Sequence, residues 1–91
     1  MSHRARKKVL VINDLGMHLR AAGALVQVAS QFKAEVSLEH KGNKVNGKSI
    51  MSVLSLAASK GCEVLVMAEG DDAEQAVDAV AGLIERGFSA T

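Results

Sequence analysis

Apolar residues alternate along this chain between the period of a strand and the period of a helix, and this alternation most constrains the fold. An apolar run ending at Ile12 predicts a strand over about residues 7–12, and apolar residues at helical spacing predict a helix over about 18–31. The remaining predicted elements are strands at 35–39, 44–46 and 63–69, a short helix from Ser49 through Leu56, and a last helix after Asp71-Asp72 that ends at Arg86-Gly87. Four strands and three helices in this order predict an α/β (α+β) two-layer sandwich whose helices cover one face of the sheet.

The length and composition indicate one small globular domain over residues 1–91. The chain is 48% hydrophobic, and its basic start predicts a flexible tail over residues 1–6. A net charge of +1 and only two aromatic residues argue against a nucleic-acid-binding module. We expect a cytoplasmic protein without membrane insertion, because there is a single cysteine and no apolar run is long enough to cross a bilayer.

One histidine occupies an unusual place at the junction of the first predicted strand and helix. His18 follows a turn that Gly16 opens, so its imidazole is expected beside the unpaired N–H groups of a helix N-terminus. Arg20 lies two residues further on, and small residues such as Ala22 follow. A lone histidine or arginine at such a place is usually a solvated surface residue. Together they predict a histidine that attacks phosphorus, with backbone donors and a guanidinium for the phosphoryl oxygens.

A second candidate site lies at the start of the short predicted helix. Ser49 is a natural N-cap, and it is also a candidate for regulatory phosphorylation, because the helix dipole tolerates a phosphoserine there. The helix should bury some of its apolar side chains and expose others. We expect exposed members among Ile50, Met51 and Leu54 to contact protein partners.

Two other kinds of site are excluded by context. Gly42, Gly47 and the following Lys48-Ser49 satisfy the literal spacing of a phosphate-binding loop. However, such a loop follows a buried parallel strand and opens a long helix, whereas a hairpin and a short helix are predicted here. We expect no cofactor and no metal, since no ligand spacing relates His3, His18, His40 and Cys62.

The stretches GMHLRAA (residues 16–22) and VNGKSIMSVLSL (residues 45–56) together resemble the family of HPr, the histidine-containing phosphocarrier protein of the bacterial phosphoenolpyruvate:sugar phosphotransferase system. The resemblance covers almost the whole chain. It implies an open-faced sandwich of order βαββαβα with an antiparallel sheet in strand order 1-4-2-3.

The resemblance also implies a function. A member of this family is a carrier and not an enzyme: His18 would accept a phosphoryl group on Nδ1 from enzyme I and pass it to the IIA component of a sugar permease. Arg20 matches the active-site arginine, and Ser49 matches the serine that HPr kinase/phosphorylase modifies in lineages that have that enzyme. The expected form is a monomer, and the expected docking residues are Leu19, Ala22, Ile50, Met51 and Leu54.

The chain departs from the family pattern beside the reactive histidine. Leu19 stands where the family usually has alanine, and Ala21 stands where it usually has proline. Alanine retains the helix but leaves its first turn less constrained than proline does. The open alternatives are a regulatory, nitrogen-type member not tied to sugar uptake, a small nucleic-acid-binding module and a hydrolase. The last would need a base partner for His18 that the sequence does not reveal.

Overall fold

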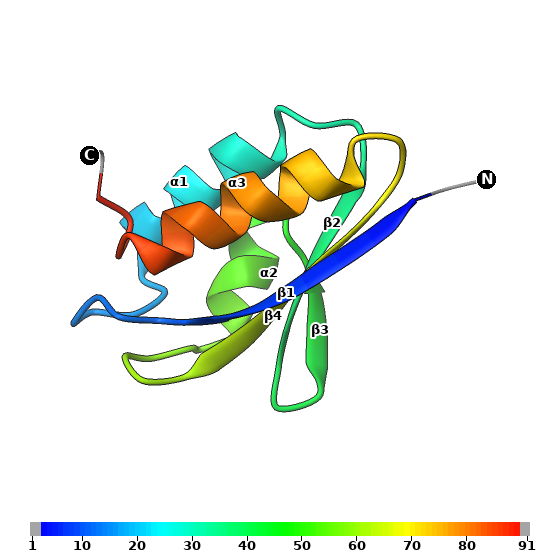
Figure 1. The fold of residues 1–91 in the computed structure, drawn as a ribbon. Helices are drawn as coiled ribbons and strands as arrows, with labels where there is room; N and C mark the ends of the chain where they lie inside the picture. The colour runs from blue at the N-terminus through cyan, green and yellow to red at the C-terminus, as the bar shows by residue number, and fades with distance from the viewer. Residues whose placement is uncertain (1–2, 90–91) are drawn as a thin grey trace.

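The computed structural model describes residues 3–89 and shows a two-layer sandwich, with three helices on one face of a four-stranded sheet (Figure 1). The antiparallel sheet has the strand order β1-β4-β2-β3, as the family resemblance implied. The elements in chain order are β1 (Arg4–Leu10), α1 (Leu19–Ala29), β2 (Glu35–His40), β3 (Asn43–Asn46), α2 (Ile50–Ser55), β4 (Glu63–Glu69) and α3 (Ala73–Glu85).

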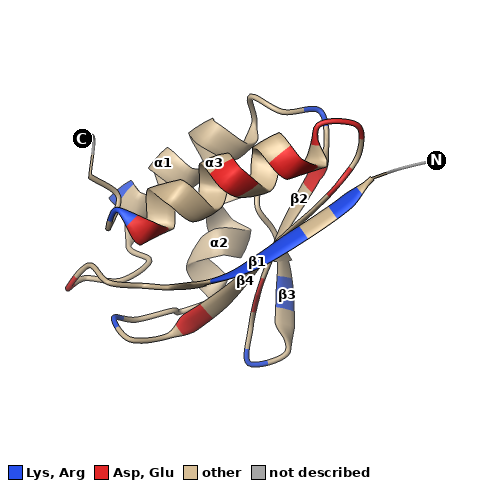
Figure 2. Cartoon of the chain, in the orientation of Figure 1, with Lys and Arg blue, Asp and Glu red and all other residues tan. Residues whose placement is uncertain are grey.

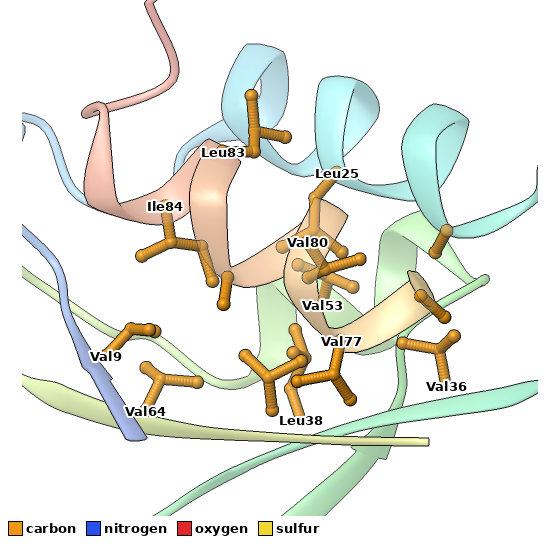
Figure 3. Close-up of a cluster of buried hydrophobic side chains, with 14 of the residues drawn as sticks. Val9, Leu25, Val36, Leu38, Val53, Val64, Val77, Val80, Leu83 and Ile84 are labelled. Carbon is orange, nitrogen blue, oxygen red and sulfur yellow. The ribbon is translucent and has the colours of Figure 1, made fainter. Parts of the chain in front are cut away.

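A single cluster of buried apolar residues fills the space between the two layers (Figure 3). Alternate residues of the central strands point into it, because successive side chains of a strand lie on opposite faces. The largest fully buried side chains are Val11, Leu25, Leu38, Val53, Val64, Val66, Val80 and Ile84. The predicted inward residues of the second strand, Val36 and Leu38, are therefore confirmed.

The first strand begins earlier than the sequence predicted. It starts at Arg4, which pairs with Glu69, and ends at Leu10, which pairs with Glu63. The prediction of a tail over residues 1–6 is wrong for residues 4–6, because backbone pairing with β4 orders polar residues that have no apolar pattern of their own. Residues 1 and 2 lie outside the described part of the chain.

Several other boundaries differ from the prediction by one or two residues. The first helix spans Leu19–Ala29 between the caps His18 and Ser30, and α2 ends at Ser55. The β2–β3 hairpin turns through Lys41 and Gly42, whose φ angles of 52° and 82° fit a two-residue type I′ turn.

The carboxylate of Asp72 has a different role from the helix cap that the sequence predicted. Asp72 precedes α3, but its side chain forms no capping hydrogen bond to that helix. Its two oxygens instead accept hydrogen bonds from the backbone N–H groups of Lys33 and Ala34, at 2.9 and 2.8 Å. Asp72 thus links the start of α3 to the loop between α1 and β2.

Three described non-glycine residues, Lys41, Ala57 and Phe88, have a left-handed backbone conformation, and one of them lies next to the segment that precedes His18. Ala57, just after α2, has a φ of 52°. Such a conformation brings Cβ close to the following carbonyl and costs an L-residue roughly 1–2 kcal/mol. The carbonyl of the next residue, Ala58, accepts a hydrogen bond from the Met17 amide at 2.9 Å. The strained residue therefore lies next to a contact that holds the segment before His18.

We predict that Ala57→Gly increases the free energy of unfolding by about 1 kcal/mol, because glycine adopts positive φ without the steric penalty. Urea unfolding would measure the difference. Ala79→Gly in the interior of α3 is the matched control and should lower the free energy of unfolding by a similar amount. Equal destabilisation by both substitutions would contradict the assignment of strain to Ala57.

We further predict that the stabilisation from Asp72 depends on pH. The pKa of Asp72 is lowered below its ordinary value of 3.8. The hydrogen bond from the Lys33 amide contributes most to this, and further backbone donors contribute less. The stabilising effect is fully present above about pH 5 and is lost as the pH falls through the lowered pKa. The difference in Tm between the wild type and Asp72→Ala should therefore shrink below pH 4, whereas the exposed control Asp71→Ala should show no comparable trend.

Candidate functional site

The segment that precedes α1 is a tight turn held by several backbone contacts. The Gly16 amide donates to the carbonyl of Asn13 at 3.1 Å, and the Met17 amide donates to the carbonyl of Ala58. Gly16 has a φ of 64°, and a Cβ there would lie 2.6 Å from the Ala58 oxygen. Only glycine fits this approach of two backbones, so the turn fixes where the next residues begin the helix.

His18 is the N-cap residue of α1 and is half-exposed. Its backbone is extended, its carbonyl accepts the first helical hydrogen bond from Ala22, and its Nδ1 accepts the backbone N–H of Arg20 at 3.2 Å. Because Nδ1 accepts a hydrogen bond here, its lone pair points toward the first turn of the helix and Nε2 carries the hydrogen of the neutral ring. The predicted placement of this imidazole beside helix amides is confirmed.

A hollow of about 290 Å³ lies beside the imidazole. The predicted pair His18 and Arg20 both line it, and among the described residues no hydrogen bond joins the guanidinium to the ring. The other lining residues come from the turn, from α1 and from the segment after α3: Asn13, Asp14, Leu15, Ala21, Ala24, Gly87 and Phe88.

Ser49 is the N-cap of α2, as predicted, and its hydroxyl oxygen accepts the backbone N–H of Ser52 at 3.3 Å. It does not adjoin His18. The Met17 amide bonds to Ala58, beyond the C-terminal end of α2, while the Lys48 ammonium bonds to the carbonyl of Phe32, beyond the end of α1. The two helices therefore pack with opposite directions, and Ser49 lies near the far end of α1.

The predicted docking residues divide into exposed and buried ones. Leu19 is 66% exposed, Met51 76% and Ile50 38%, whereas Leu54 is half-buried against the core. Ala22 was wrongly predicted, because it is fully buried in the core cluster. The exposed residues lie on helices with almost no charge: α2 has none and α1 has only Arg20 (Figure 2).

Electrostatic effects near the turn involve one exposed ion pair. Nζ of Lys60 donates a hydrogen bond to Oδ1 of Asp14 at 2.7 Å. This hydrogen bond and the charge of the ammonium lower the pKa of Asp14. Both side chains are well exposed, so the pair contributes little to stability. Nearby, a hydrogen bond with the Ser59 hydroxyl lowers the pKa of the Cys62 thiol.

A larger hollow of about 530 Å³ lies on the sheet, away from His18. Its lining mixes opposite charges, with Arg4, Arg6 and Lys44 beside Glu35 and Glu69. Within residues 3–89 there is no group of histidine, cysteine and carboxylate side chains suited to a metal ion. No helix in that range is long and apolar enough to span a membrane.

Sequence reasoning missed most of the other residues that line the hollow, among them Asn13, Leu15 and Phe88. Asn13 had a detectable signal, because asparagine three residues before a glycine is typical of a turn. Leu15 is 77% exposed beside the imidazole, which hydrophobicity alone would not predict. Phe88 reaches the site through the packing of the segment after α3 near the first turn, and no local pattern indicates this contact.

Comparison with known proteins identifies a family over most of the chain. A family model described as PTS HPr component phosphorylation site matches residues 5–86. The match includes β1 from its second residue and ends at Arg86, the C-cap of α3. It therefore includes both the His18 turn and the Ser49 cap.

Solved structures of this family superpose closely on the chain. HPr-C-His from Thermoanaerobacter tengcongensis is 42% identical with a TM-score of 0.88, and 92% of this chain and 94% of that one are covered. The phosphocarrier protein HPr from Bacillus anthracis str. Ames is 38% identical, with a TM-score of 0.85 and coverage of 89% and 96%. Crh, a catabolite repression protein of Bacillus subtilis described as a domain-swapped dimer, is 40% identical, with a TM-score of 0.75 and coverage of 91% and 95%.

Proposed function

We propose, because this chain belongs to the HPr family of phosphotransferase-system phosphocarriers, that His18 accepts a phosphoryl group from phospho-enzyme I and transfers it to IIA components of sugar permeases. The general role as a phosphocarrier follows from the family. The proposal adds the acceptor atom, the residues that assist it and the partners. On this account the protein is a carrier that acts in the cytoplasm as a monomer, and its partners are the enzymes.

One observation supports the choice of acceptor more than any other, namely the hydrogen bond from the Arg20 amide to Nδ1 of His18. This bond holds the Nδ1 lone pair toward the helix N-terminus and leaves the proton on Nε2. In the transfer, the Nδ1 lone pair forms the new nitrogen–phosphorus bond. The bond between phosphorus and the donor group breaks, and its electron pair leaves with the donor.

The first turn of α1 then provides donors for the transferred group. The amides of Leu19, Arg20 and Ala21 precede the first helical hydrogen bond, which runs from Ala22 to His18, so they have no acceptor within the helix. Phosphoryl oxygens on Nδ1 can replace the ring nitrogen as the acceptor of the Arg20 amide and can also accept from the other two amides, and the helix dipole favours the added negative charge. The exposed Arg20 side chain, which lines the same hollow, would add charge-assisted hydrogen bonds.

The exposed apolar residues of α1, of α2 and of the turn before α1 form the proposed docking surface, which we define as Leu15, Leu19, Ile50 and Met51. Exposed leucine and methionine side chains suit contacts with several partners, because they adapt to different surfaces. Ser49 adjoins this surface at its α2 end, so a phosphate there would add charge where apolar contacts are needed. HPr kinase/phosphorylase would be the modifying enzyme in an organism that has it.

A regulatory role without sugar uptake is the second candidate. The chain is as similar to Crh, at 40% identity, as it is to the HPr proteins at 42% and 38%. In this chain His18 would be the acceptor for either role, so the two roles would differ in partners. Transfer from the phosphorylated chain to a purified IIA component of a sugar permease favours the first candidate, and a stable phosphoprotein that no IIA component discharges favours the second.

We predict that His18→Asn abolishes labelling by enzyme I and phosphoenolpyruvate. Asparagine is a good N-cap and preserves the start of α1 while removing the nucleophile. The label on the wild type should be labile to acid and stable to base. His40→Asn is the control, because His40 ends β2 on an exposed part of the sheet, and it should be labelled at the wild-type rate. Persistent labelling of the His18 variant would remove His18 from the proposed role.

We predict that Ser49→Asp weakens the binding of enzyme I by roughly tenfold, about 1.4 kcal/mol, through charge placed beside Ile50 and Met51. Ser55→Asp at the exposed other end of α2 is a charge-matched control and should have a smaller effect. Isothermal titration calorimetry with purified enzyme I would measure both affinities. An unchanged affinity for the Ser49 variant would reject a regulatory effect at this position.

A further inference from the structure

The geometry points to Asn13 as a positioning residue for the phosphoryl-accepting imidazole. Asn13 lines the same hollow as His18 but lies five positions earlier, at the start of the turn. Its side-chain amide fixes the carbonyl of Gly16, and that carbonyl accepts a hydrogen bond from the backbone N–H of His18. The assignment rests on the proposed function of His18 as acceptor, but the geometry itself can be tested separately.

The Gly16 carbonyl is the point at which the two residues meet. Its oxygen accepts a hydrogen bond from Nδ2 of Asn13 at 2.7 Å and another from the backbone N–H of His18 at 3.0 Å. The Gly16 amide donates in return to the Asn13 carbonyl. The side chain of Asn13 therefore stabilises the orientation of one peptide group, and that peptide group orients the N-cap residue.

The amide orientation of Asn13 is fixed by chemistry. A rotation by 180° would place Oδ1 against the Gly16 oxygen, and two acceptors repel each other at that distance. In the observed orientation Oδ1 is buried, and no hydrogen-bond partner for it is found among residues 3–89. A buried acceptor without a partner lowers the free energy of unfolding. The hydrogen bond from Nδ2 to the Gly16 oxygen must offset this loss.

The opposite side of the turn cannot compensate for the loss of this bond. There the Met17 amide is bound to the carbonyl of Ala58, and a Cβ at Gly16 would lie 2.6 Å from that oxygen. The turn is thus held between Ala58 on one side and Asn13 on the other. Removal of the Asn13 amide leaves the peptide group between Gly16 and Met17 held on the Ala58 side alone, so its carbonyl is less firmly oriented and the hydrogen bond from Arg20 to Nδ1 loses part of its fixed geometry.

Two substitutions test the role of the donor. Asn13→Asp keeps the shape but presents a carboxylate oxygen to the Gly16 oxygen, and Asn13→Ala removes the group altogether. Asn13→Ser retains a shorter side chain whose hydroxyl can donate and should restore part of the effect. Asn43→Asp, in the exposed β2–β3 hairpin, is the control for the added charge and should behave as the wild type.

Two readouts separate positioning from simple stability. In ¹⁵N NMR spectra, the Nδ1 resonance of His18 and the amide resonance of Arg20 should shift in the Asp and Ala variants. In phosphoryl transfer from phospho-enzyme I, kcat should fall roughly 10–100-fold while KM stays the same, because a misplaced nucleophile slows the reaction without altering the docking surface.

The result that would overturn the proposal is a variant with a lower Tm but wild-type kcat and unchanged Nδ1 and Arg20 resonances, which would leave Asn13 with a structural role only. A change in KM without a fall in kcat would also count against a positioning role. If the wild-type chain accepted no phosphoryl group from enzyme I, the proposed function would fail, and the NMR comparison would still decide whether Asn13 orients the ring.

Discussion

The hydrogen bond from the Arg20 amide to Nδ1 of His18 is the interaction on which the function of this protein depends. It makes a side chain the N-cap of a helix and selects one tautomer of the imidazole. The atom that must react is therefore occupied by a helix amide before a partner arrives. After transfer, the same amide and its neighbours can bind the phosphoryl oxygens, so the resting and loaded states use one set of donors.

The rest of the fold determines where that helix begins. The sheet positions β1 and β4 side by side, and the segments after β1 and before β4 then meet around Gly16, Met17 and Ala58. The strain at Ala57 and the close approach at Gly16 are both located at this meeting point. Strained backbone persists only where its surroundings hold it in place, and here the surroundings are the segments that orient the N-cap.

Much of the fold could be predicted from the sequence, because the apolar periods are regular and the turns contain glycine. The bounds of β4, the cap at Ser49 and the place of His18 beside the first helix amides agree with the prediction. The start of β1 could not be predicted, because residues 4–6 are ordered by pairing with a strand about sixty residues away in sequence. The predicted side-chain cap at Asp72 was wrong for the same kind of reason, because its carboxylate binds two backbone amides of a distant loop and not those of α3. At the site, the burial of Ala22 follows from which side of α1 packs into the core, and the contribution of Phe88 follows from tertiary packing.

The central claim is that the Arg20 amide, which donates to Nδ1, binds the phosphoryl group together with its neighbours in the first turn. Heteronuclear NMR of the ¹⁵N-labelled protein, recorded before and after phosphorylation, tests it most directly. The account predicts phosphorus bonded to Nδ1 of His18, with the largest amide shifts at Leu19, Arg20 and Ala21. Phosphorus on Nε2, or first-turn amides that keep their resonances when the group is attached, would contradict it.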